Sequence, residues 1–183
     1  LQSELPPGVP AVRDFITGRR VRATPEEVDA VQVIARRLVE DYGYPKAHIQ
    51  THPQHRVRRR PSGGDDSYPI DVGVFSSKSR ADEDLFIVVE CKKKNLKDGL
   101  EQLRIYMDMS AAEVGVWFNG DEHVYIRKVY RKGGRATYER TPNIPRYGQR
   151  IEDVGKYLRK DLRKPQNLKV VFRDLRNHLA GNA

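Results

Sequence analysis

The chain has almost no cysteine, no long apolar run and no glycine-rich phosphate loop, and each absence excludes a class of protein. Cys91 is the single cysteine among 183 residues, which excludes an internal disulfide and any zinc site built from several cysteines. One unpaired cysteine favours a reducing, cytoplasmic compartment. No stretch approaches the roughly 18 consecutive apolar residues of a membrane-spanning helix, so we expect no membrane partner. Without a Gly-x-x-x-x-Gly-Lys-[Ser/Thr] loop, this chain alone should not hydrolyse ATP.

Positive charge, in contrast, is in excess. Lys and Arg number 34 against 25 Asp and Glu, which gives a formal net charge of +9 and makes a polyanion the first partner to consider. The length fits one domain of ordinary size. Residues 1–13 lack the basic-then-apolar pattern of a secretion signal, and the first residue is Leu1. We therefore expect a processed chain or a module cut from a longer one.

The N-terminal part predicts an arm followed by a helix. Residues 1–23 hold three prolines and a glycine at positions 6–10, which is typical of a loosely attached arm. Thr24 suits a helix N-cap, with Pro25 at the first helical position and Glu27 completing a capping box. Apolar residues then follow helical spacing as far as Gly43, the expected C-terminal stop.

The rest of the chain alternates between strand and helix patterns. We expect strands over residues 48–59, 68–75, 84–92, 114–118 and 123–130, and helices over residues 97–111, 151–162 and 168–179. Residues 85–89 are apolar throughout, which is typical of a strand covered on both faces. In the 68–75 strand, alternation predicts that Ile70, Val72 and Val74 share one face.

This order of elements predicts an α/β or α+β fold, in which helices flank a mixed central sheet. We expect a core domain over residues 24–140. Residues 141–148 suit a linker, and the whole of 141–183 is expected to form a helical extension that leads into a further domain.

Two acids and a lysine stand near the ends of neighbouring strand patterns. Asp71 lies in the 68–75 strand, and Glu90-Cys91-Lys92 ends the next strand. Alternation places Glu90 and Lys92 on one face, with Cys91 pointing away. Because Glu90 follows five apolar residues, its carboxylate emerges from the sheet core and needs compensation by a cation, a metal ion or protonation.

If these two strands are neighbours, Asp71 and Glu90 can share a divalent ion such as Mg²⁺, which prefers oxygen ligands. Lys92 would then orient or deprotonate a water and neutralise charge that develops on phosphorus. The pattern outlines a phosphodiesterase site. The alternative is chance, because 32% of the residues are charged and an Asp followed by Glu-x-Lys arises easily in such a chain.

The helix that follows adds Gln102 and Tyr106, which lie four residues apart on one face. Pro69-Ile70-Asp71, Glu90-Cys91-Lys92 and Gln102-xxx-Tyr106 together resemble the PD-(D/E)xK nuclease superfamily, in its Gln-xxx-Tyr branch. Gly43-Tyr44-Pro45 and Trp117-Phe118-Asn119-Gly120 bring the chain closer still to the N-terminal nuclease domain of type I restriction enzyme R subunits. The resemblance covers about residues 24–130.

The resemblance implies a restriction-endonuclease-like core and a Mg²⁺-dependent DNA endonuclease activity, with Mn²⁺ as a substitute ion. It further implies DNA as partner, together with other domains or subunits of a restriction–modification complex. Asp71 and Glu90 match the metal-binding acids and Lys92 the catalytic lysine. Gln102 and Tyr106 match the helix that supports the site and contacts DNA. For these two the alternative is a helix-surface glutamine and a core tyrosine.

The family also carries an acid on the first helix, for which Glu26, Glu27 and Glu40 are candidates. Leu38, in the apolar stripe, lies about 20° from Glu27 around the helix axis, whereas Glu40 is expected to face solvent. We choose Glu27 as a further metal ligand, and its capping-box role remains the alternative.

Basic clusters are the candidate DNA contacts, and from them we select Arg58, Arg59 and Lys94. Such clusters would bind a duplex strongly and without sequence preference, although a merely solvated surface is the alternative for each residue. The histidines show no metal-ligand spacing and are expected at the surface. Two alternatives stay open for the whole chain, namely a non-catalytic nucleic-acid-binding or assembly module on the same fold, and a metal-dependent RNase or repair nuclease.

Overall fold

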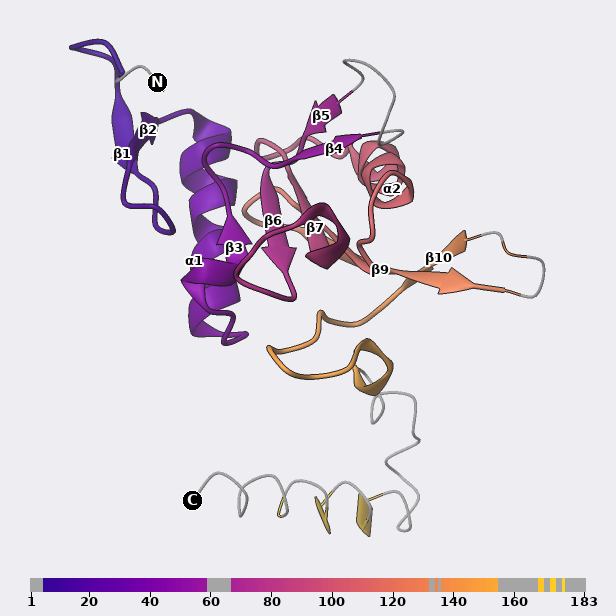
Figure 1. The fold of residues 1–183 in the computed structure, drawn as a ribbon. Helices are drawn as coiled ribbons and strands as arrows, with labels where there is room; N and C mark the ends of the chain where they lie inside the picture. Colours follow the sequence, from indigo (N-terminus) through magenta and orange to yellow (C-terminus); the bar gives the residue numbers. More distant parts are fainter. Residues whose placement is uncertain are drawn as a thin grey trace.

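The computed structural model describes residues 5–58, 67–131, 134 and 136–154, together with residues 168, 169, 172, 173 and 176. Its centre is a six-stranded sheet with the order β10-β9-β8-β7-β6-β3 (Figure 1). The strands are β3 (Ile49–Gln50), β6 (Val72–Phe75), β7 (Leu85–Cys91), β8 (Val114–Phe118), β9 (His123–Tyr130) and β10 (Ala136–Arg140). The β7–β8 pair is parallel and the other neighbours are antiparallel, so the predicted mixed sheet is confirmed.

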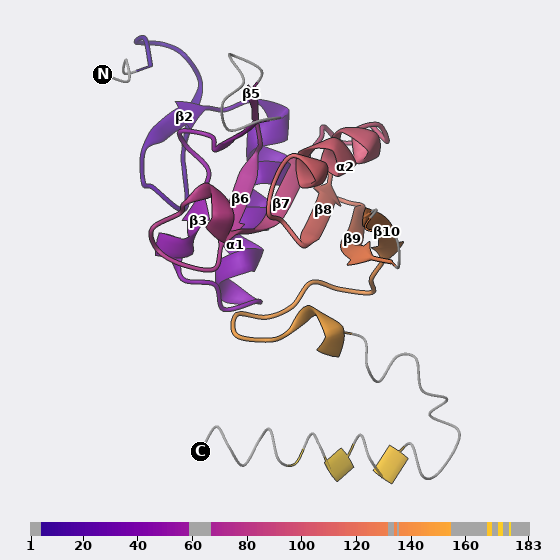
Figure 2. The same ribbon diagram turned by 45° about the vertical axis from the view of Figure 1, so that its right-hand side comes forward.

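One helix covers each face of this sheet. On one face, α1 (Gln32–Glu40) packs Ile34 and Leu38 against the apolar side chains of β6, β7 and β8. On the other face, α2 (Leu100–Asp108) packs Leu103 and Met107 over β7 and β8, and Figure 2 shows α2 beside these two strands. Alternate residues of β7 thus pack in two different apolar clusters. This confirms the prediction, made from the continuous apolar run, that the strand is covered on both faces.

The first helix begins after Thr24, as predicted, and the Thr24 side chain accepts a hydrogen bond from the Glu27 backbone amide at 3.1 Å. Its first turns are not regular, because residues Glu27–Val31 form a π-helical segment, η1, before α1 begins. Gly43 has a φ of +77° just after the helix, so the expected C-terminal stop is confirmed.

Two small hairpins flank the main sheet: β1 (Ala11–Arg13) with β2 (Arg20–Arg22), and β4 (Arg56–Arg58) with β5 (Ser67–Pro69). The expectation of a loosely attached N-terminal arm was wrong. Asp14 in the first hairpin is fully buried, and Phe15 has the cationic groups of Arg36 and Lys46 at 4.3 and 3.7 Å from its ring centre. Polar and cation–π contacts of this kind leave no signal in the arm's composition.

The strand predicted over residues 68–75 is two strands, β5 and β6, separated by a bend at Asp71. Ile70 packs on the α2 side, whereas Val72 and Val74 pack on the α1 side, so the prediction of one shared face was wrong. The Ile70 amide donates to the carbonyl of His55 and continues the small hairpin, and the chain then turns to pair with β7. The predicted strand over 48–59 divides in the same way between β3 and β4.

The C-terminal part adds a strand that the sequence analysis missed. β10 is a polar edge strand, paired with β9 alone among the described strands, and edge strands carry little apolar alternation. Ile144, Ile151 and Val154 join the α1-side cluster, so apolar packing continues past residue 140. Of the two predicted late helices, the described residues include the short helix η4 (Ile151–Asp153), while most of both ranges lies outside them. No helix of the described part is long and apolar enough to cross a membrane.

Candidate functional site

Asp71 and Glu90 come together because β6 and β7 are antiparallel neighbours. Val72 pairs with Val89, and one further step along the same register brings Asp71 opposite Glu90, whose side chain lies on the α2 face of the sheet because Val89 and Cys91 pack on the α1 face. The Asp71 Oδ2 atom accepts a hydrogen bond from the Cys91 backbone amide at 2.7 Å. The neighbouring strands that a shared ion requires are therefore present.

Glu90 is the only charged side chain of β7 and is 3% exposed. Lys92, just after the strand, places its Nζ atom 2.6 Å from Glu90 Oε1, while its backbone amide donates to the Phe118 carbonyl. Cys91 between them points into the α1-side cluster, as alternation predicted. The lysine therefore supplies the cation for a buried carboxylate.

Burial disfavours the ionised forms of both acids. Burial and the charge of Asp71 raise the pKa of Glu90 to about 7, although Lys92 opposes the shift. Burial also raises the pKa of Asp71 to about 6, with the Cys91 amide opposing it and the charge of Glu26 adding to it. Lys92 loses solvation, yet its bond to Glu90 leaves its pKa above the usual value. Two carboxylates and one lysine thus leave negative charge uncompensated.

The helix α2 contributes Tyr106 and Gln102 beside this pair. Tyr106 is buried in the α2-side cluster, and its hydroxyl accepts a hydrogen bond from the Gln102 amide. Burial raises the pKa of Tyr106, and the charges of Glu90 and Asp71 raise it further. The ring of Tyr68 in β5 lies 6.3 Å from that of Tyr106. Tyr106 is thus a core aromatic whose hydroxyl is sensitive to the acidic pair.

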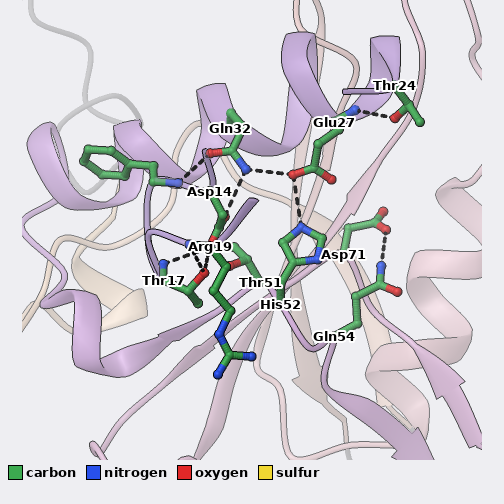
Figure 3. A network of polar contacts seen from close by, with 11 residues as sticks. Asp14, Thr17, Arg19, Thr24, Glu27, Gln32, Thr51, His52, Gln54 and Asp71 are labelled. Carbon is green, nitrogen blue, oxygen red and sulfur yellow. Dashed lines mark hydrogen bonds and ion pairs between the residues drawn. The ribbon is translucent and has the colours of Figure 1, made fainter. Parts of the chain in front are cut away.

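Glu27 belongs to a second polar network, which Figure 3 shows. Its Oε1 atom accepts a hydrogen bond from Gln32 Nε2 at 2.7 Å and lies 3.1 Å from His52 Nε2. The hydrogen bond to Glu27 raises the pKa of His52, despite partial burial. His52 lies at the surface in part, with 26% of its side chain exposed, and whether Glu27 also ligates a metal stays a prediction. Glu40, by contrast, faces solvent as predicted, and the structure adds an ion pair with Arg36.

Asp14 anchors this network from the N-terminal hairpin. Its two oxygens accept four hydrogen bonds, from Gln32, Thr51 and the amide and hydroxyl of Thr17. Asp14, Glu27 and His52 bring one ligand atom each to within 4.8 Å of one another. Because the Asp14 oxygens already have these donors, the group has the character of a structural junction between the hairpin, the first helix and β3.

We expect the Asp14→Ala variant to lower the free energy of unfolding by about 2–4 kcal/mol, because three side-chain donors and one amide lose a buried acceptor. The hydrogen bonds from Thr17 and Gln32 overcome burial and lower the pKa of Asp14, so its contribution is present near neutrality and lost as pH falls through its folded pKa. Urea titration at pH 7 measures the effect. The exposed Asp41→Ala control should change stability by less than about 0.5 kcal/mol; equal values for both would contradict the role of Asp14.

Gln54 is a residue that the sequence analysis missed. Its Nε2 atom donates to Asp71 Oδ1 at 3.0 Å, so both oxygens of Asp71 accept a hydrogen bond from the protein. His52 and Gln54 follow β3, whose pairing with β6 brings this segment close to Asp71, and no local pattern in the sequence predicts such a long-range pairing. The one sequence signal for this network was Gln32, a polar residue within the apolar stripe of the first helix.

Of the three candidate DNA contacts, Arg58 and Lys94 lie among the described residues. Arg58 is exposed at the end of β4, and Arg59 lies outside the described residues. Lys94 follows the site and its Nζ atom is 3.4 Å from an oxygen of Asp121. Lys94 is close in sequence to Glu90. Its charge is, however, partly neutralised by the Asp121 carboxylate.

Comparison with known proteins adds a family. The family model of the type I restriction enzyme R protein N terminus matches residues 25–145, a range that begins at the first helix and extends beyond β10. It includes Asp71, Glu90, Lys92 and all of α2. Neither the curated proteins nor the solved structures gave a match. Because the family model spans more than half of the chain, this protein belongs to the family of type I restriction enzyme R protein N-terminal domains.

Proposed function

We propose that this domain is the Mg²⁺-dependent DNA endonuclease module of a restriction–modification protein, with a restriction-endonuclease-like core of the PD-(D/E)xK type. One observation carries the proposal: the β6–β7 register sets Asp71 opposite Glu90, and Lys92 Nζ lies 2.6 Å from Glu90. Family membership supports a role in restriction–modification.

The donor set fits a hard divalent cation. Both acids offer carboxylate oxygens, both have a raised pKa because burial disfavours their ionised forms, and the single lysine beside them offsets only part of their negative charge. Mg²⁺ binds to one or two carboxylates and completes its shell with water and phosphate oxygens. When bound at Asp71 and Glu90, the ion would polarise a phosphodiester and lower the pKa of a coordinated water.

The chain's own residues provide orientation and charge. The Cys91 amide and Gln54 fix the two oxygens of Asp71 in one orientation, and Lys92 fixes Glu90. Because the pKa of Lys92 is raised, this residue acts as a hydrogen-bond donor: it would orient the attacking water and neutralise charge on the phosphoryl oxygens during in-line displacement. Tyr106 of α2 lies within the electrostatic influence of Glu90 and Asp71 and accepts a hydrogen bond from Gln102.

The test of this function is a nicking assay on supercoiled plasmid with the purified chain. We expect nicks with Mg²⁺ or Mn²⁺ and none after chelation with EDTA. Cleavage of RNA but not of plasmid would assign the site to an RNase. An absence of cleavage together with tight, metal-independent DNA binding would support a non-catalytic module instead.

DNA binding should depend steeply on salt, because the chain carries a net charge of +9 and phosphate contacts release counterions. We expect Arg58→Ala and Lys94→Ala each to weaken binding several-fold and to reduce the slope of log K against log salt by about one. Fluorescence anisotropy with a labelled duplex measures both. Arg36→Ala on α1, whose arginine pairs with Glu40, is the control, and an equal loss for it would contradict a DNA face near the site.

A further inference from the structure

The loop that precedes α2 crosses directly over Lys92. Gly99 has a φ of +98°, a conformation that disfavours every residue with a side chain. A Cβ atom at this position would lie 2.6 Å from Lys92 Cε and 3.5 Å from Glu90 Cγ. The backbone of Gly99 therefore packs against the aliphatic parts of both residues. The space that a Cβ atom at this position would need is filled by Lys92.

Trp117 holds this loop in place from β8. It pairs with Glu90 in the parallel β7–β8 register, is 3% exposed, and donates a hydrogen bond from Nε1 to the carbonyl of Asp98 at 2.7 Å. A buried indole N–H needs an acceptor, and this one ties the sheet to the residue before Gly99. The indole thus fixes how closely the loop approaches Lys92.

We propose that Trp117, Asp98 and Gly99 form a buttress that positions Lys92 against Glu90. Lys92 is held at three points: its amide by the Phe118 carbonyl, its stem by Gly99 and its Nζ atom by Glu90. A four-carbon side chain loses much rotamer freedom in such a site. Trp117 and Gly99 are therefore positioning residues for Lys92, and their effect on catalysis rests on the proposed nuclease function.

The same loop sets the start of α2. The Leu103 amide donates to the Gly99 carbonyl at 2.9 Å, the first backbone bond of that helix. The buttress consequently determines where the helix of Gln102 and Tyr106 begins relative to Lys92. A shift of this loop would therefore move the start of α2 and the contact with Lys92 together.

A stability cycle tests the contact without any use of nuclease activity. Gly43→Ala is the matched control, because Gly43 also has a positive φ, +77°, but a Cβ there has no atom within 4 Å. We expect Gly43→Ala to lower Tm by about 2–4 °C and Gly99→Ala to lower it at least twice as much. In a Lys92→Ala background, which removes Cε, the loss caused by Gly99→Ala should shrink to that of the control. If Gly99→Ala does not fold, recovery of folding in that background gives the same result.

The kinetics of nicking then test whether Trp117 and Gly99 position Lys92. Trp117→Phe removes the indole N–H while keeping an aromatic ring, and we expect it and Gly99→Ala to reduce kcat for nicking at least tenfold, with KM for DNA within twofold. Gly43→Ala should leave both unchanged. The inference is overturned if Gly99→Ala costs no more than Gly43→Ala, if Lys92→Ala does not relieve it, or if Trp117→Phe raises KM alone. If the wild-type chain does not cleave DNA but the stability cycle shows the coupling, the nuclease proposal fails and the buttress stands.

Discussion

Lys92→Met should reduce Mg²⁺-dependent nicking at least a hundredfold, in line with the loss of one charged group that acts on the transition state (about 10²–10³). The methionine keeps the aliphatic stem under Gly99 but removes the ammonium that touches Glu90. Asp71→Asn should reduce nicking to a similar extent, because the amide replaces a charged ion ligand while it can still accept a hydrogen bond from Cys91.

Lys78→Met is the matched control for the lysine. Lys78 is exposed and follows β6 at the end away from Asp71, so its removal should change the rate by less than about threefold. Circular dichroism and Tm establish that each variant folds. Cleavage by both Lys92→Met and Asp71→Asn at rates near the wild type would show that this pair of residues does not carry the reaction.

Glu90→Gln should remove activity and yet stabilise the metal-free protein at pH 8. The pKa of Glu90 is raised to about 7, so the folded state favours the protonated acid and its ionisation opposes folding. Stability from this group is complete below its unfolded pKa, near 4.5, and is lost as pH rises through about 7. At pH 8 we expect the variant to gain about 1–3 kcal/mol, since one pKa unit corresponds to about 1.4 kcal/mol.

The pH dependence of Tm measures this effect. In metal-free wild type, Tm should rise as pH falls from 8 to 6, whereas Glu90→Gln should be flatter over the same range. Mg²⁺ should raise the Tm of the wild type at pH 8, and not that of the variant. If Glu90→Gln lowers Tm equally at pH 6 and pH 8, the bond to Lys92 outweighs burial and the electrostatic account is wrong.

Much of the sheet could be predicted from sequence because its elements carry strong local patterns. The bounds of β8 and β9 agree with the residues expected, and the run within β7 indicated burial on both faces, which Ile87 and Val88 confirm by packing in opposite clusters. The bend at Asp71 was missed because an extended segment that changes partners keeps a strand-like composition. β10 was missed because an edge strand needs few apolar residues.

From the sequence, Asp71 and Glu90 could be predicted to share an ion only if their two strands are neighbours. Alternation put Glu90 and Lys92 on one face, but the pairing of β6 with β7 is a long-range contact that no local pattern fixes. The contacts of Asp14, His52 and Gln54 could not be predicted from the sequence for the same reason. Each residue meets its partner through tertiary packing, at a separation of 17 or more positions in the sequence. Glu27 was placed at the edge of the buried stripe, and its bonds to Gln32 and His52 agree with that position.

The most direct test of the central claim is calorimetric titration of the purified chain with Mn²⁺ at pH 7.5, together with Glu90→Gln and His52→Gln. The account predicts saturable binding in the wild type, its loss in Glu90→Gln, and near wild-type binding in His52→Gln. Binding that survives Glu90→Gln and disappears in His52→Gln would move the metal to the Asp14–Glu27–His52 group and contradict a site at Asp71 and Glu90.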